Sequence, residues 1–500
     1  MAMRQIDHWI GGEQRRGSPQ SMFEVTDPVT GAVIAEVPMA SPGDVDAAIG
    51  TARSAWPQWR EASLSTRAAV MFAFRELLEQ HRLELAETIS AEHGKVRADA
   101  LGELRRGVEV VEFACGVGQL LKGERTDDIS SQHDAYTVRQ PVGVVAGITP
   151  FNFPAMVPMW MFPVAIACGN SFVLKPSEKD PSVSVRIGQL FAEAGLPDGV
   201  FNVLHGDADA VNALCEHPGI DAVSFVGSTP IARHVHRTAS LAGKRVQALG
   251  GAKNHMIVLP DADIGQAADA AVSAGYGSAG ERCMAISVVV AVGAIGDELC
   301  EAICRRIDAL RIGPGLGTEP VDMGPLVTAE HRDRVLSYID LGESEGAALR
   351  RDGRGFTVDA HPGGFWVGPT LLDDVTADMK VYEDEIFGPV LCLVRVDSFD
   401  EAMELVENNQ FGNGVALFTR DGGAARRFRR EAPVGMVGVN VAIPVPMAYH
   451  SFGGWKDSLF GDHHMHGPEG VRFCTRLKAV TEHWPDPADR GVDLGFPTAR

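Results

Sequence analysis

Apolar positions in the first quarter of the chain recur with a helical period. Val45, Ala48, Ile49 and Ala52 lie three or four positions apart, and similar spacing returns up to residue 122. Side chains at that spacing share one face of an α-helix. We therefore expect residues 44–122 to form amphipathic helices, followed by a polar, irregular stretch at 125–140.

From residue 142, short apolar runs alternate with helical stretches. Strands are expected at 142–148, 171–175, 201–204, 221–226 and 244–249, with helices at 156–167, 182–194, 207–216 and 229–240. Strands separated by helices of about 10–15 residues are typical of a parallel sheet covered by helices on both faces. Such sheets bind ligands beyond the carboxyl ends of their strands.

A second alternating series begins near Met256 and predicts another α/β domain. Its expected helices are 264–278, 297–310 and 398–408, and its expected strands are 286–292, 390–396 and 415–419. Residues 485–500 are rich in proline, aspartate and glycine, and we expect them to be a tail.

Composition narrows the classes of function. The 500 residues carry 45 Lys and Arg against 66 Asp and Glu, a net charge of −21, which argues against binding nucleic acid or anionic membranes. Eight cysteines are too sparse for a disulfide framework, so we expect reduced thiols and a cytoplasmic location. The charge-free stretch 141–174 is interrupted by prolines, and we interpret it as buried core rather than a membrane span.

Histidines cluster at 463–466, in the sequence His463-His464-Met465-His466. No cysteine stands at ligand spacing from them, so the pattern favours a solvated loop and we expect no metal.

Two polar residues are candidates for covalent chemistry. Cys283 follows a glycine-rich segment and comes directly after Arg282, whose charge favours a nucleophilic thiolate. Asn152 follows an expected strand, where its amide can donate to an oxyanion. The alternatives are structural: a small buried cysteine and an asparagine that caps a turn.

Two further segments suit a nucleotide. Gly227-Ser228-Thr229 opens an expected helix, where a phosphate binds readily, although a simple helix cap also explains it. Lys175 and Glu178 end an expected strand and suit the hydroxyls of a ribose. Taken alone, the second segment favours an exposed strand end.

Taken together, these segments resemble the aldehyde dehydrogenase superfamily, from about residue 7 to residue 484. The matching stretches are ITPFNFP (148–154), VLKPSE (173–178), FVGST (225–229), GERC (280–283) and EIFGPV (385–390). The resemblance implies a Rossmann-like NAD-binding domain, a second α/β catalytic domain, and a β-hairpin arm that joins subunits into a homotetramer. The implied boundaries are 1–124 with 141–253 for the NAD-binding domain, 254–466 for the catalytic domain, and 125–140 with 467–484 for the arm.

The resemblance also implies roles for single residues. Cys283 corresponds to the nucleophile and Asn152 to the amide of the oxyanion hole. The implied NAD contacts are Thr149, Phe151, Lys175, Glu178, Lys179, Ser228, Gly250 and Glu385, of which Glu385 holds the nicotinamide ribose. Glu178 favours NAD over NADP, because a carboxylate repels the 2′-phosphate, and Lys179 weakens that preference slightly.

One departure from the family pattern points to a branch. Hydrolytic members carry Glu-Leu-Gly-Gly, whose glutamate activates water, whereas this chain has Ala248-Leu249-Gly250-Gly251. A thiol forms its own thiolate far more readily than water ionises, so an acyl-enzyme without that glutamate suits transfer to a thiol. The sequences at 156–170, 251–255, 277–285 and 454–462 resemble the coenzyme A-acylating branch, which oxidises and decarboxylates malonate and methylmalonate semialdehydes.

The substrate carboxylate of that branch needs a cationic partner. Arg282 and Arg106 are the candidates, because a guanidinium pairs with a planar carboxylate through two hydrogen bonds. Ordinary structural ion pairs are the alternative for both.

Three other functions remain open from the sequence. A hydrolytic dehydrogenase of another carboxylic semialdehyde, such as succinate semialdehyde, should carry glutamate at position 248. A non-catalytic NAD-binding protein has no need for Cys283, Asn152 and Glu385 together. A cysteine hydrolase needs a histidine base, and His255 is the only histidine near these motifs.

Overall fold

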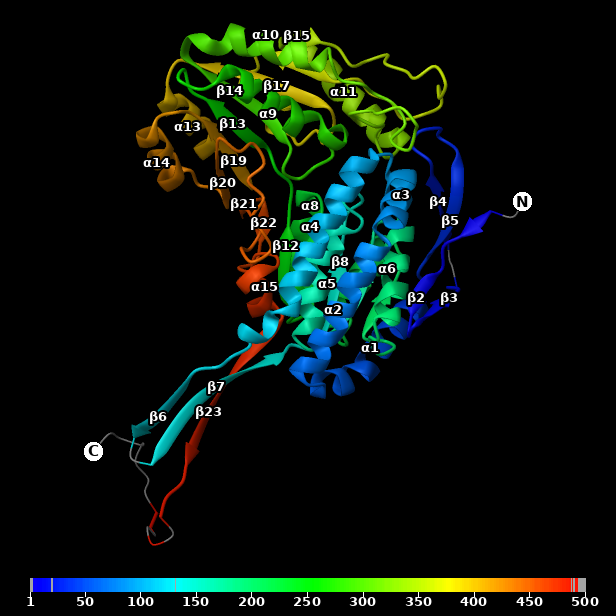
Figure 1. Cartoon of the computed structure of the whole chain (residues 1–500), viewed down its shortest axis with the longest axis vertical. Helices are drawn as coiled ribbons and strands as arrows, with labels where there is room; N and C mark the ends of the chain where they lie inside the picture. The colour runs from blue at the N-terminus through cyan, green and yellow to red at the C-terminus, as the bar shows by residue number, and fades with distance from the viewer. Residues whose placement is uncertain (1–2, 19–20, 131, 487, 489–490, 493–500) are drawn as a thin grey trace.

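The computed structural model describes residues 3–18, 21–130, 132–486, 488 and 491–492. It contains two α/β lobes and a long three-stranded arm that extends away from them (Figure 1). Most of the predicted tail, including 493–500, lies outside the described residues. Within the described ranges, none of the helices has the length and apolar character needed to cross a membrane.

The first lobe is built on an eight-stranded sheet with the order β22-β12-β11-β8-β9-β10-β2-β3. Its five central strands are parallel, and the others join antiparallel at the two edges. The bounds are β2 His8–Ile10, β3 Glu13–Arg15, β8 Val144–Ile148, β9 Ser171–Lys175, β10 Phe201–Val203, β11 Ala222–Val226, β12 Arg245–Leu249 and β22 Leu459–Phe460.

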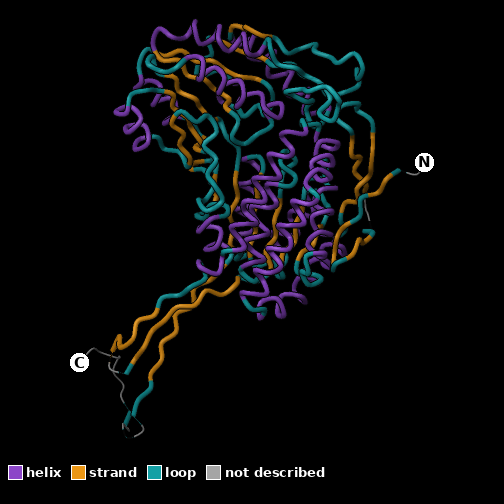
Figure 2. The backbone as a smooth tube through the Cα atoms, viewed as in Figure 1, coloured by secondary structure: helices purple, strands orange, loops and turns teal. Residues whose placement is uncertain are grey.

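Helices cover both faces of this sheet (Figure 2). The connecting helices are α5 Met156–Ala167, α6 Ser182–Glu193, α7 Ala208–Glu216 and α8 Thr229–Leu241. The predicted helical region 44–122 forms α1 Pro42–Glu61, α2 Leu64–Gln80, α3 Arg82–His93, α4 Arg97–Cys115 and the short turn η1 Val117–Gln119. Every residue of α5 is buried, which confirms that the charge-free stretch belongs to the core.

The second lobe contains a seven-stranded sheet with the order β15-β16-β17-β14-β13-β19-β20. Its strands are β13 Asn254–Val258, β14 Ile286–Val292, β15 Ala348–Arg351, β16 Thr370–Asp373, β17 Val390–Val396, β19 Gly414–Phe418 and β20 Met436–Val439. Its helical segments are α9 Ile264–Tyr276, η2 Gly277–Gly280, η3 Gly293–Ile295, α10 Gly296–Ile307, α11 Ala329–Glu345, α12 Lys380–Glu383, α13 Phe399–Asn408 and α14 Gly422–Glu431. The second α/β region predicted from residue 256 is therefore confirmed.

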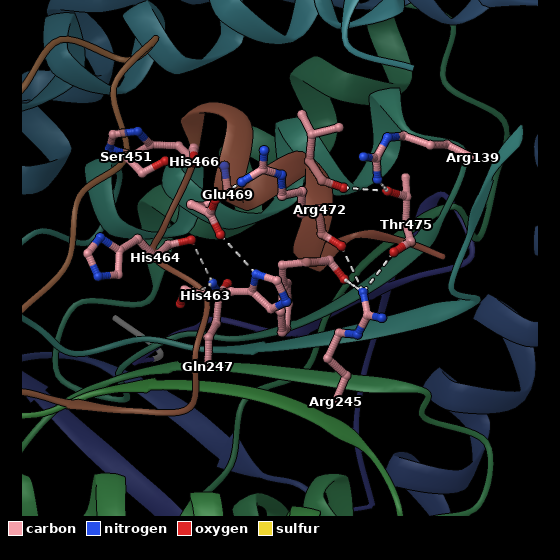
Figure 3. Close-up of polar contacts among 12 residues, drawn as sticks. Arg139, Arg245, Gln247, Ser451, His463, His464, His466, Glu469, Arg472 and Thr475 are labelled. Atoms are coloured by element: carbon pink, nitrogen blue, oxygen red, sulfur yellow. Dashed lines mark hydrogen bonds and ion pairs between the residues drawn. The ribbon is translucent and has the colours of Figure 1, made fainter. Parts of the chain in front are cut away.

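The arm consists of β6 Arg125–Ser130, β7 His133–Pro141 and β23 Thr475–His483, paired antiparallel in the order β23-β7-β6. The predicted arm segment 467–484 begins with helix α15 Gly467–Phe473, which packs beside α5 at the base of the arm. There Arg245 donates to the carbonyls of Arg472, Phe473 and Thr475, which ties β12 to the end of α15 (Figure 3).

The histidines at 463–466 lie in the loop before α15 (Figure 3). His463 pairs with Glu469 at 3.1 Å, whereas the ring of His466 is buried and its backbone has a φ of 39°. Among the described residues, no group of three or more His, Cys, Asp and Glu side chains is arranged to hold a metal ion.

Small sheets that the periodicity did not predict complete the fold. One is the three-stranded sheet β1-β5-β4, with bounds β1 Arg4–Gln5, β4 Ser21–Thr26 and β5 Val33–Met39. The other pairs β18 Phe411–Gly412 with β21 Trp455–Lys456.

Candidate active site

Cys283 lies in a tight connection between α9 and β14. Ser278 and Ala279 both adopt a positive φ of 52°, and a Cβ on Gly280 would lie 2.1 Å from the carbonyl oxygen of Gly388. The carbonyl of Cys283 itself accepts hydrogen bonds from the side-chain amides of Asn254, at 2.9 Å, and of Asn413, at 3.1 Å. The backbone of the predicted nucleophile is therefore held on several sides.

Cys283 lines a cavity in the second lobe, together with Arg282, Lys253, Glu385 and Phe387. Among the described residues that line it, Glu385 is the only carboxylate. Burial raises the pKa of the Cys283 thiol to about 12, and the Glu385 carboxylate adds to the rise. At neutral pH this upward shift favours the protonated thiol.

Arg282 does not outweigh these effects on the thiol. Its charge lowers the pKa of Cys283, but burial and Glu385 dominate. The guanidinium is engaged by Asp99, at 2.7 Å. The charge of Arg282 thus acts in the predicted direction, but it is smaller than the opposing effects of burial and Glu385.

Asn152 follows β8 and is held at both its main chain and its side chain. Its carbonyl accepts from the ammonium of Lys95 at 2.6 Å, and Lys95 pairs with Glu103 at 2.8 Å in the core. Its Nδ2 donates to the carbonyl of Glu281 at 3.0 Å. An amide NH₂ has two hydrogens, so this bond, to a residue two positions before Cys283, leaves the second one for a ligand.

The polar residues at the strand ends of the first lobe also lie together. Lys175 Nζ and Glu178 Oε2 are 3.2 Å apart. Burial raises the pKa of Glu178, but Lys175, a backbone hydrogen bond and Lys179 together outweigh it, so the net shift is downward. Ser228 is exposed before α8, with no side-chain cap on that helix, and the buried hydroxyl of Thr149 has no hydrogen-bond partner. These groups remain available to a ligand.

The other predicted cofactor residues differ in orientation. The ammonium of Lys179 lies 4.6 Å from the centre of the Phe151 ring, whereas the carboxylate of Glu178 pairs with Lys175. At Gly250, a Cβ would lie 2.6 Å from the carbonyl oxygen of Asp457, so the backbone passes too closely for a side chain.

Glu385, in the second lobe, lines the Cys283 cavity. Its Oε1 accepts the backbone N–H of Ala252 at 3.0 Å, and burial raises its pKa to about 7. Residue 248, where hydrolytic members carry glutamate, is a fully buried alanine in β12 that pairs with Phe225 and Phe460.

The two candidate arginines lie in different surroundings. Arg282 lines the Cys283 cavity. Arg106, on α4, donates to the carbonyl of Pro446 at 2.5 Å and pairs with Glu109 at 2.5 Å, and it is not among the described residues that line that cavity.

Several residues of the site were not predicted from the sequence. Lys95 and Glu103 are buried polar groups near Asn152 that no local pattern identifies, whereas Glu281 stands in the GERC motif, which was its only signal. Lys253 and Asn254 stand in the stretch 251–255 that carried the branch resemblance, which was their only signal.

Comparison with known proteins agrees with this architecture. The aldehyde dehydrogenase family profile matches residues 15–480. A malonate-semialdehyde dehydrogenase of Pseudomonas aeruginosa is 54% identical over 498 residues, covering 99% of this chain and 100% of the relative. A second relative with that name, from Geobacillus kaustophilus, is 50% identical and covers 96% of this chain and 99% of its own.

Two solved structures are similar throughout. A putative methylmalonate-semialdehyde dehydrogenase from Sinorhizobium meliloti, complexed with NAD, has a TM-score of 0.96 and 51% identity, covering 98% of this chain and 100% of its own. A methylmalonate-semialdehyde dehydrogenase from Oceanimonas doudoroffii has a TM-score of 0.96 and 52% identity, covering 97% and 99%. The chain belongs to the aldehyde dehydrogenase family.

Proposed function

We propose that the protein is an NAD-dependent dehydrogenase of malonate or methylmalonate semialdehyde that transfers the acyl group to coenzyme A and releases CO₂. The observation that carries the proposal is the combination of Cys283 and Asn152 in one site with alanine at position 248. Relatives with these substrates in their names, about half identical over nearly the whole chain, support it.

The residues of the first lobe fit NAD. Thr149 offers an unpartnered buried hydroxyl, Ser228 lies at the open end of α8, and Lys175 with Glu178 suits a ribose. We assign the nicotinamide ribose to Glu385, and Phe151, Lys179 and Gly250 to the same groove. NAD, when bound, supplies the acceptor for the hydride that leaves the substrate.

Cys283 is proposed as the nucleophile. Its sulfur, once its proton has passed to solvent, forms a bond to the aldehyde carbon as the electrons of the C=O π bond move to oxygen. The resulting oxyanion accepts hydrogen bonds from the free Asn152 N–H and the Cys283 backbone N–H. After loss of hydride, Cys283 carries an acyl thioester. The β-carboxylate departs as CO₂, leaving its electron pair on carbon, where a proton is taken up, and the thiolate of coenzyme A displaces Cys283.

The substrate carboxylate is assigned to Arg282, with Arg106 as a second cation. Arg282 lies in the Cys283 cavity, and exchanging its bond to Asp99 for one to the substrate keeps the guanidinium paired. Arg106 reaches the loop at Pro446 and Met447. A substrate with a carboxylate should therefore be preferred over propanal.

We also assign residues 1–124 and 141–253 to the NAD-binding domain, 254–466 to the catalytic domain, and 125–140 with 467–484 to an arm that joins a homotetramer. A cytoplasmic location belongs to the same proposal.

A steady-state assay tests this function. NADH formation from malonate semialdehyde should be fast with coenzyme A, slow without it, and accompanied by equal amounts of CO₂ and acetyl-CoA. Succinate semialdehyde and propanal should be poor substrates. Fast NADH formation that does not depend on coenzyme A, with free carboxylic acid as product, would instead identify a hydrolytic dehydrogenase.

A further inference from the structure

The segment 252–254, which leads into β13, contacts both Glu385 and Cys283. The backbone N–H of Ala252 donates to the carboxylate of Glu385 at 3.0 Å. The side chain of Asn254 donates to the carbonyl of Cys283 at 2.9 Å. The segment 252–254 therefore spans the distance between the nucleophile and the proposed ribose ligand, and Lys253 stands in its middle.

Lys253 is a buried ammonium held only by main-chain carbonyls among the described contacts. Its side chain is 3% exposed, and Nζ donates to the carbonyl oxygens of Val381 and Asp384, each at 2.7 Å. It forms no ion pair within the described residues. Burying such a charge is costly unless hydrogen bonds compensate for it. The two bonds therefore stabilise the ammonium and also hold the main chain at Val381 and Asp384.

The two carbonyls that Lys253 binds belong to Val381 and Asp384, which stand four positions and one position before Glu385 in the sequence. Val381 belongs to the four-residue helix α12, whose last carbonyls have no partners within the helix, and Asp384 precedes Glu385 in sequence. On the other side, Arg334 donates to the carbonyl of Glu385 at 3.0 Å. The main chain is thus held on both sides of Glu385, by Lys253 before it and by Arg334 at its own carbonyl, while Ala252 binds its carboxylate.

We propose that Lys253 is a positioning residue that acts through Glu385. It fixes the peptide before Glu385, and the bonds from Ala252 and Asn254 then set where the carboxylate stands relative to Cys283. The inference rests on the proposed ribose role of Glu385 and extends it to a residue that has no assigned contact with the cofactor.

The test uses K253M, which keeps the length of the side chain and removes its donors. The matched control is K244M, because Lys244 binds two carbonyls in the same way, at 2.6 and 2.8 Å, in the first lobe. NADH binding, followed by its fluorescence, should weaken about tenfold in K253M and stay unchanged in K244M. The KM for the semialdehyde should change little in either variant.

A double-mutant cycle separates positioning from general destabilisation. In the E385Q background K253M should cause no further loss of NADH affinity, because the residue through which Lys253 acts is already altered. The inference is overturned if K253M leaves NADH affinity intact, or if it weakens binding equally in both backgrounds. NADH binding requires no turnover, so a wild-type protein that binds NADH but is inactive on semialdehydes refutes the proposed function alone.

Discussion

The two lobes contribute to the site in opposite ways. The first lobe presents groups whose hydrogen bonds are unfilled, such as the hydroxyl of Thr149 and the uncapped start of α8 at Ser228. The second lobe presents Cys283 on a backbone bonded to Asn254 and Asn413. The first is built to receive a ligand, and the second to hold a reacting atom in place. Changes at the strand ends of the first lobe, such as Lys175, should therefore alter affinity, and changes around Cys283, including Asn152, should alter rate.

The largest effect is expected at the nucleophile. C283A should lower kcat for NADH formation by at least about 10⁴-fold, because no acyl thioester is formed, while NADH affinity stays within about twofold. C115A, which removes a half-buried thiol at the end of α4, is the control and should remain active. An active C283A protein would show that Cys283, and with it the second lobe, does not supply the nucleophile.

The next effect concerns the oxyanion. N152A should reduce kcat by about 10²–10³-fold with a smaller change in KM, because its donor matters most as negative charge develops on oxygen. Stopped-flow measurement of the first turnover checks this directly. An effect confined to KM would make Asn152 a substrate-binding residue.

A smaller effect is expected in the first lobe. K175M should raise the KM for NAD about tenfold and leave kcat within about twofold, as expected for one charge-assisted hydrogen bond. Parallel titrations of NAD and of the semialdehyde measure the split. A fall in kcat at saturating NAD would contradict the division between the lobes.

The last effect concerns stability rather than activity, and it is a pH dependence at Glu281. Burial raises its pKa from 4.5 to about 8, so the native state keeps a proton that the unfolded chain loses above pH 4.5. Wild-type stability therefore falls as pH rises from about 4.5 to 8, by up to about 1.4 kcal/mol per unit. E281Q removes this loss, so its Tm relative to wild type should rise between pH 5.5 and 8.

The control for E281Q is E216Q, which removes an exposed carboxylate from α7. Its Tm difference from wild type should be nearly independent of pH. A flat difference for E281Q as well would mean that Glu281 is ionised in the native protein.

Elements formed by continuous apolar runs were predictable from the sequence. The bounds of α5, β9 and β14 agree with the predicted 156–167, 171–175 and 286–292, because each is a continuous buried run between polar or glycine-rich turns. The small sheet β1-β5-β4 was not predicted, since β1 has two residues and the sequences of β4 and β5 do not alternate regularly between apolar and polar residues.

The site was predictable only where one segment carries the chemistry. Cys283 and Asn152 each stand in a recognisable motif, but the bond from Asn152 to the carbonyl of Glu281 joins residues 129 positions apart. Likewise, nothing in the sequence places Lys95 under Asn152 or Lys253 before Glu385. Such contacts arise from tertiary packing within and between the lobes, which periodicity does not encode.

The central claim is that an acyl group on Cys283 waits for coenzyme A rather than for water. Intact-protein and peptide mass spectrometry after mixing the enzyme with NAD and malonate semialdehyde, without coenzyme A, tests it most directly. The predicted result is an acetyl thioester on Cys283 that persists and is converted to acetyl-CoA, in equal amount, when coenzyme A is added. An enzyme that stays unmodified while releasing free acid and NADH would contradict it.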